Sequence, residues 1–356
     1  MTFVKKESPF VRKDTSSNKM MLDVLIALIP VVLFAVYRFG WDAVIRIVVS
    51  LVVMIGLEAV AVAMVTRPKG NKFFEKLKSR FANYSLTNVT APAVSAVIFV
   101  MLVPSKLPIY AVVVGAAFAI IIVKMVFGGL GSNIFNVAAG GRVFIGIALA
   151  GMFSGAYPGV DALAGATPLG ALATNSLGYL THSYSVYDLF IGNIPGAMGE
   201  ISALAILLGL AYLLIRRTAD WRVVVSALGT FLLLTLLVGL VRFPDEVGTY
   251  VLYSVFSGGL LFGVSFMVTD PVTSPVTGPG RILYGALVAA IVVLIRSFGS
   301  FPEGVAFAIL FANMLVPLID YGKWSTNKVR PWFVVGFSVF VIAMCAVVFF
   351  GAGGSF

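Results

Sequence analysis

Eleven stretches of this 356-residue chain are apolar over about the length that a helix needs to cross a lipid bilayer. A transmembrane helix takes roughly 20 mainly apolar residues. Hydrophobic residues make up 60% of the chain and charged residues 11%, which is far outside the usage of soluble globular proteins. The sequence therefore predicts an all-α polytopic membrane protein. Its expected spans are 20–38, 41–65, 88–104, 107–127, 134–154, 198–215, 221–241, 250–269, 282–298, 302–319 and 331–350.

Lys and Arg residues are placed unevenly between these spans. They gather in the N-terminal tail and in the connections 66–87, 216–222 and 320–331, whereas 143–215 contains none. Positive residues in short loops are retained on the cytoplasmic side. We therefore expect a cytoplasmic N-terminus, an outer position for the long fifth connection, and a multi-pass protein of a bacterial or archaeal cytoplasmic (inner) membrane.

The same pattern divides the chain into three parts. They are a cytoplasmic tail at 1–19, a membrane core at 20–320 with an outer loop at 155–197, and a linker with one further transmembrane helix at 321–356. The net charge of +10 lies mostly in the cytoplasmic segments. We interpret it as topology and contact with the lipid bilayer, with no nucleic-acid partner.

Two segments inside the apolar region cannot be continuous helix. The run from Met267 to Arg281 contains prolines and several hydroxyl groups, and 128–141 is rich in glycine. Each proline removes a backbone donor, so the helix must end or unwind. The unwound backbone could line a polar site, or Asp270 could simply cap an ordinary turn.

The two segments also resemble each other. Residues 136–146 can be laid over 275–285 so that Arg142 coincides with Arg281, although four matches in eleven positions are weak evidence of duplication. Together the segments contain the candidates for a polar site: Asn136, Arg142, Asp270, Thr273 and Arg281. Glu58, in the middle of an apolar stretch, is a further ionisable residue that fits either a structural pair or an ion pathway.

Metal-based electron carriers are excluded for this chain acting alone. It has one cysteine, Cys345, and one histidine, His182. An iron–sulfur cluster needs four thiolates and a bis-histidine haem needs two imidazoles. If the protein handles electrons, the carrier is organic or is shared with another chain.

Thr167 stands out in the longest connection. It follows Gly165 and Ala166 and precedes a proline. Thr followed by Pro is a common helix start, so the pattern favours a capping role. The small neighbours would also leave room for a bulky group attached to the hydroxyl.

At this point the residues resemble the family of membrane flavin subunits that includes RnfD and NqrB. The resemblance runs over almost the whole chain. Its blocks are 8–10 with 20–30, 128–136, 165–169, and 266–275 continuing to 304–310 and 316–320. Two positions depart from the family pattern, because Ala164 replaces a usual Ser or Thr and Val137 replaces a usual Asn-Pro. The short N-terminal tail resembles RnfD more than NqrB.

The resemblance implies a ten-helix core with Gly/Pro-broken segments, to which this chain adds a C-terminal helix. It also implies FMN bound covalently to Thr167 through a phosphoester, with a second, non-covalent flavin such as riboflavin in the same protein. The implied partners are the other membrane, flavin and iron–sulfur subunits of an Rnf complex, and a flavin transferase. The implied activity is electron relay between ferredoxin-side and NAD-side subunits, coupled to Na⁺ or H⁺ transport.

Three other functions fit the composition equally well. An NqrB-like quinone-reductase subunit would also carry a flavin. A small-solute transporter or channel would have unwound segments inside a helical bundle but no chromophore. A structural scaffold for other membrane subunits would have neither a chromophore nor solute flux.

Overall fold

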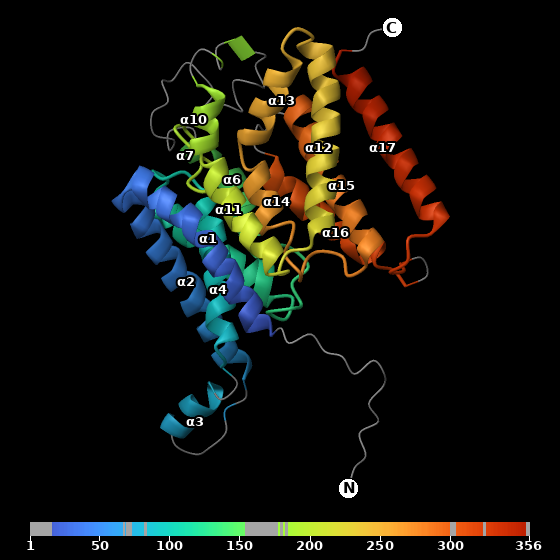
Figure 1. Ribbon diagram of the computed structural model, residues 1–356. Helices are drawn as coiled ribbons and strands as arrows, with labels where there is room; N and C mark the ends of the chain where they lie inside the picture. Colours follow the sequence, from blue (N-terminus) through green and yellow to red (C-terminus); the bar gives the residue numbers. More distant parts are fainter. Residues whose placement is uncertain are drawn as a thin grey trace.

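The computed structural model describes residues 16–66, 68, 73–81, 84–153, 177–178, 181, 184–299, 304–322 and 325–353. These residues form a bundle of helices without strands, which confirms the prediction of an all-α membrane protein (Figure 1). The helices are α1 (Ser17–Phe39), α2 (Trp41–Val65), α3 (Phe73–Arg80), α4 (Thr87–Met101), α5 (Ile109–Phe118), η1 (Ala119–Met125), α6 (Val137–Ala148), α7 (Ala150–Phe153), α10 (Val186–Ile191), α11 (Ala203–Ile215), α12 (Trp221–Arg242), α13 (Val247–Phe256), α14 (Leu260–Phe266), α15 (Gly278–Phe298), α16 (Val305–Ile319) and α17 (Pro331–Gly351).

Every one of the eleven predicted spans contains a helix, but not every helix is long enough to cross a bilayer. Five described helices are long and apolar enough, namely α1, α2, α12, α15 and α17. The pair α13 and α14 makes a sixth span if it is counted as one helix bent by 50°. The bend falls at Gly258, whose φ of +70° suits a residue without a side chain. The other spans hold shorter helices, because their chains leave helical geometry inside the protein.

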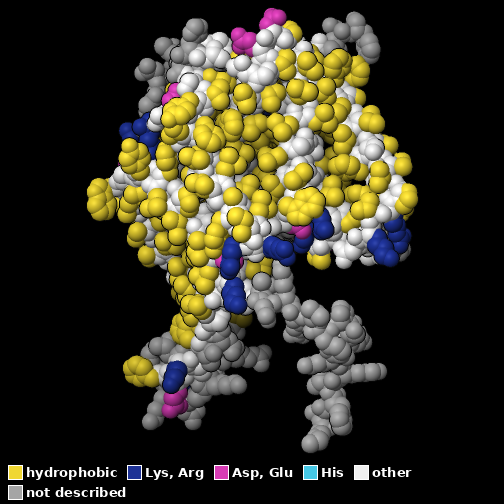
Figure 2. Space-filling view, viewed as in Figure 1, with side chains coloured by type: hydrophobic (Ala, Val, Ile, Leu, Met, Phe, Trp, Pro, Cys, Tyr) yellow, Lys and Arg dark blue, Asp and Glu magenta, His cyan; other side chains and the backbone are white. Residues whose placement is uncertain are grey.

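The surface of the bundle divides into an apolar middle and two polar ends. Figure 2 shows hydrophobic side chains over the middle of the molecule and most of the Lys and Arg side chains along its lower edge. This basic end carries the start of α1, the end of α11 and the starts of α12, α15 and α17. Its cations include Lys19, Arg216, Arg217, Arg222, Arg281, Lys328 and Arg330.

The core is built from close contacts between short and long helices. α12 packs along α15, α2 along α4, and α1 along α11. α14 lies wholly inside the bundle, since all seven of its residues are buried. Short buried helices of this kind place their ends, and therefore unpaired backbone groups, inside the protein.

One such end lies where α4 stops at Met101. The N–H groups of Met198 and Gly199 donate to the carbonyls of Val103 and Met101, at 3.2 and 2.7 Å. The expected spans at 88–104 and 198–215 thus shrink to helices that end at Met101 and begin at Ala203. Backbone that leaves a helix at membrane depth requires partners inside the protein, and these two segments supply them to each other.

Candidate functional site

A cavity of about 70 Å³ lies inside the bundle near the basic end. Both segments that break the helical pattern line it: the glycine-rich connection between η1 and α6, and the connection between α14 and α15. The ends of α1 and α11 and one side of α4 complete the wall. The polar side chains in the lining are those of Ser95, Lys124, Asn133, Asn136, Thr218, Thr269 and Asp270.

Asp270 organises the unwound segment after α14. Its Oδ1 accepts a hydrogen bond from the backbone N–H of Val272, and its Oδ2 accepts one from the Thr273 hydroxyl, both at 3.1 Å. The carboxylate therefore caps its own turn while it lines the cavity. The two interpretations of Asp270 do not exclude each other, because these two bonds leave part of the acceptor capacity of the carboxylate available.

Asn136 holds the other broken segment in place. Its Oδ1 accepts a hydrogen bond from the N–H of Ala139 at 3.1 Å, which makes Asn136 the N-cap of α6. Its own N–H donates to Oδ1 of Asn313 at 3.0 Å. The start of α6 is thereby fixed to α16.

Asn313, which sequence reasoning missed, ties the two broken segments together. Its Nδ2 donates to the carbonyl of Thr273 at 3.1 Å and to the hydroxyl of Tyr284 at 2.8 Å, while its Oδ1 binds Asn136. The side chain is fully buried. The available signal was a single amide in the otherwise apolar stretch 302–319, because a buried amide requires hydrogen-bonding partners.

Lys124 joins the cavity to a buried acid. It lies in η1, a π-helical segment, and its Nζ is 2.5 Å from Oε2 of Glu58 on α2. Each of the two side chains is only 2% exposed. Glu58 ends a narrow buried stripe of α2 whose polar members, Arg46 and Ser50, bind backbone carbonyls of neighbouring segments. Glu58 therefore has the paired environment that a buried carboxylate needs.

Arg142 lies away from this cavity. Its Nε donates to the carbonyl of Leu102 at 2.7 Å, directly after α4 ends, and its guanidinium stacks over the ring of Phe153 at 4.3 Å. The contact satisfies a carbonyl that the broken helix leaves without a helical partner. The geometry gives Arg142 a structural role, and a role in cofactor binding stays a prediction.

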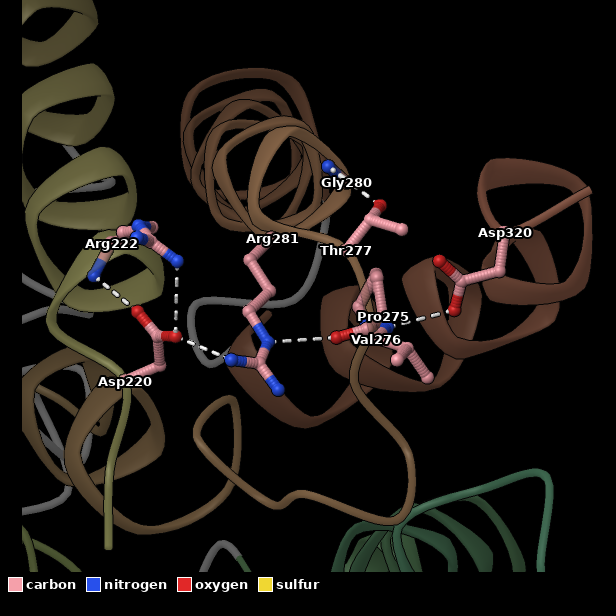
Figure 3. A network of polar contacts seen from close by, with 8 residues as sticks. All are labelled: Asp220, Arg222, Pro275, Val276, Thr277, Gly280, Arg281 and Asp320. Atoms are coloured by element: carbon pink, nitrogen blue, oxygen red, sulfur yellow. Dashed lines mark hydrogen bonds and ion pairs between the residues drawn. The ribbon is translucent and has the colours of Figure 1, made fainter. Parts of the chain in front are cut away.

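Arg281 also lies outside the cavity, at the surface of the basic end. Its Nε donates to the carbonyl of Pro275 at 2.9 Å, and its Nη1 pairs with Asp220 (Figure 3). In the same network the N–H of Val276 donates to Oδ2 of Asp320 at 2.9 Å. These contacts fix the path of the unwound segment from outside, while Asn313 fixes it from inside.

The remaining predicted residues, Gly165, Ala166 and Thr167, lie outside the described residues. Of the other five, the structure brings Asn136, Asp270 and Thr273 together around one cavity and its wall. Arg142 and Arg281 are separate from it, each at its own helix break.

The size of the cavity limits what it can hold. A buried water needs about 10–15 Å³ of such space, so 70 Å³ has room for roughly five waters. Pockets for organic ligands are usually about 300–1,000 Å³. The lining offers a carboxylate, an ammonium group, amides and hydroxyls, which suit water or a small cation better than an aromatic ring system.

Comparisons with known proteins agree with this architecture. The family model described as "NQR2, RnfD, RnfE family" matches residues 4–329. One subunit of a "Na(+)-translocating NADH-quinone reductase" from Chromohalobacter salexigens is 36% identical over 242 residues, which cover 67% of this chain and 59% of that protein. The chain therefore spans less than two thirds of that relative's length.

Two further relatives match over nearly their whole length. One protein of an "Ion-translocating oxidoreductase complex" from Shewanella amazonensis is 33% identical over 351 residues, covering 90% of this chain and 96% of the relative. One protein of a "Na(+)-translocating ferredoxin:NAD(+) oxidoreductase complex" from Acetobacterium woodii is 35% identical over 317 residues, covering 88% and 91%. Both relatives are named as the component of their complex that carries the letter D.

Proposed function

This chain belongs to the NQR2, RnfD, RnfE family, and we propose that it is the RnfD component of an ion-translocating oxidoreductase, with FMN bound covalently to Thr167. The observation that carries the proposal is the match with two components of such complexes over 88–90% of this chain. The quinone-reductase relative matches a shorter part, which favours the ferredoxin:NAD type over the quinone-reductase type.

FMN would supply the electron-transfer chemistry, and the chain would supply its attachment and position. The Thr167 hydroxyl is the group through which the phosphoester would form. Gly165 and Ala166 leave space beside it, because neither carries more than a methyl group. A covalent bond keeps the cofactor on the outer side, where the lack of Lys and Arg in 143–215 is expected to place this loop.

The partners in this proposal are the other membrane, flavin and iron–sulfur subunits of the complex, and the flavin transferase that attaches FMN. Electrons would pass between the ferredoxin-side and NAD-side subunits through this chain. Their passage would be coupled to transport of Na⁺ or H⁺. The chain alone would complete no reaction.

The internal cavity would serve the coupling ion rather than a second flavin such as riboflavin. Its volume of about 70 Å³ accommodates water and a small cation. Asp270 supplies a carboxylate at the cavity, and the Lys124–Glu58 pair closes its side toward α2. An ionisable group at membrane depth usually marks such a pathway.

The flavin proposal is tested by fluorescence in a denaturing gel. We expect the native chain, produced with a flavin transferase, to keep its fluorescence after denaturation and Thr167→Ala to lose it. Thr174→Ala, which changes another threonine of the same loop, is the matched control and should remain fluorescent. A dark native chain beside a labelled control substrate would leave the solute transporter and the scaffold as the better explanations.

The role of the cavity is tested separately with Asp270→Asn in the assembled complex. We expect coupled ion transport to fall while the fluorescence attached to Thr167 is unchanged. Asp245→Asn, which alters an exposed acid at the opposite end of the molecule, should change neither. If Asp270→Asn left coupled transport and flavin content unchanged, the cavity would have no part in coupling.

A further inference from the structure

The last helix, α17, contacts the bundle closely only near its C-terminal end. There Val348 is fully buried, Gly351 lies against the ring of Phe298, and the carbonyl of Ala352 accepts a hydrogen bond from Nε of Arg242 at 3.2 Å. Toward the basic end most residues of α17 are exposed. Figure 1 shows α17 leaning away from α12 in this direction. A crevice therefore opens between α17 and the bundle.

Two cavities lie along this crevice. The first, of about 110 Å³, reaches from the start of α15 to the start of α17; its lining includes Thr277, Ser325, Lys328, Arg330 and Phe333. The second, of about 290 Å³, lies between α12, α15 and α17; its lining includes Arg222, Val225, Gly229, Ile282 and Phe337. The rings of Phe333 and Phe337 stack 6.0 Å apart, about one helical turn along α17. The two cavities thus follow the same face of α17.

The mouth of the crevice has more positive than negative charge. Arg222 and Arg281 share one carboxylate, that of Asp220 (Figure 3). Lys328 and Arg330 are exposed, and neither forms an ion pair within the part of the chain that the structure describes. This end therefore offers two cations, together with the hydroxyl groups of Ser325 and Thr326, to an anionic group from outside the protein.

The walls further in are apolar, and tryptophans stand at the mouth. Val225, Ile282 and Phe337 form the walls of the second cavity, while Trp221 and Trp332 lie at the starts of α12 and α17. Tryptophan at this level is typical of the boundary between headgroups and acyl chains. A ligand that fits both features has a negative head and a long apolar tail.

We propose that this crevice binds an anionic glycerophospholipid. Its phosphate would contact Lys328 and Arg330 beside the start of α15, and an acyl chain would lie in the cavity along Gly229 and Phe337. Basic pockets between transmembrane helices are a known means of holding anionic headgroups. The lipid would fill the space that α17 leaves open and so join this helix to α12 and α15.

A helix of another subunit fits this space less well. One turn of a helix about 10 Å across and 5.4 Å in pitch takes roughly 400 Å³, whereas the larger cavity has about 290 Å³. A free phosphate compound would leave the apolar walls uncovered. The combination of a narrow apolar crevice with a cationic mouth favours a single lipid chain with its headgroup.

The headgroup contact is tested by titrating the purified full chain with two lipids that have identical acyl chains, phosphatidylglycerol and phosphatidylcholine, and counting bound lipid by native mass spectrometry. From two cations near the phosphate we expect phosphatidylglycerol to bind about 30-fold more tightly. The double substitution Lys328→Gln with Arg330→Gln should abolish this preference. Lys76→Gln with Lys78→Gln removes the same charge from exposed positions of α3 and should retain it.

The acyl contact is tested by filling the crevice. A Cβ added at Gly229 would meet no atom within 4 Å, so Gly229→Leu can extend into the cavity without a clash. We expect it to lose most of the bound lipid. Gly56→Leu, at an exposed and equally open position of α2 outside both cavities, is the control. Equal binding of the two lipids by the native chain, or unchanged binding by Gly229→Leu, would overturn the proposal.

Discussion

Buried arginines in this bundle bind backbone carbonyls rather than carboxylates at their Nε atoms. Nε of Arg46 donates to the carbonyl of Leu107 at 2.8 Å, and Nε of Arg142 donates to that of Leu102 at 2.7 Å. Both carbonyls lie in the irregular segment between α4 and α5. Because no water reaches such groups in a bilayer core, each would otherwise be costly to leave unpaired. The two arginines thus permit α4 to end inside the protein.

The Lys124–Glu58 pair gives the sharpest prediction at the scale of single residues. Lys124→Met leaves a buried carboxylate without its partner, which usually costs about 3–5 kcal/mol of unfolding free energy. The double variant that adds Glu58→Gln removes both charges and should recover most of this loss. Thermal or denaturant unfolding in one detergent measures both. If the two substitutions destabilised the protein additively, the pair would not interact as its geometry indicates.

Helix breaks separate what the sequence predicts from what it does not at the scale of elements. The break at 267–277 was predicted because its prolines and hydroxyl groups cannot continue a helix. The breaks after Met101 and before Ala203 were not, because apolar residues continue through both positions. Those breaks depend on hydrogen bonds from Gly199 and Arg142, which are distant in sequence. A local pattern contains no information about such partners.

The candidate site shows the same division. Asp270 and Asn136 could be chosen from the sequence because each lies in a segment with an unusual content of Gly, Pro or hydroxyl residues. Asn313 could not, since its apolar helix shows no break around it. Its role arises only when α16 packs between the two broken segments and presents the amide to Asn136 and Thr273 at once.

Close packing of α1, α11 and α14 leads to a prediction for one glycine. A Cβ at Gly209 would collide with the carbonyl oxygen of Ala27 and lie 2.8 Å from Cζ of Phe266. Gly209→Ala should therefore separate these helices and cost about 1–3 kcal/mol of stability. Gly56→Ala, at an open helical position, should instead stabilise α2 by up to about 1 kcal/mol. Unfolding curves of the two variants should shift in opposite directions; a common direction would contradict the packing at Gly209.

At the scale of the whole molecule, charge and apolar surface form successive layers. Apolar side chains cover the middle, most cations lie at one end, and the connection between α12 and α13 at the other end carries the exposed acids Asp245 and Glu246 (Figure 2). The internal cavity and the mouth of the α17 crevice both lie toward the basic end. The layers agree with the distribution of Lys and Arg along the sequence, from which a cytoplasmic position of the basic end is expected.

This orientation is testable by labelling intact cells with a membrane-impermeant maleimide. Cys345 is first replaced by Ala, which removes the chain's one thiol. Asp245→Cys, at the end of the molecule opposite to α3, should then react in intact cells, whereas Lys76→Cys should react only after the membrane is opened. Both positions are exposed, so a difference between them reports sidedness rather than burial. The reverse pattern would place the basic end outside, and it would also move the Thr167 loop to the cytoplasmic side, where a covalent tether would no longer serve to retain FMN outside the membrane.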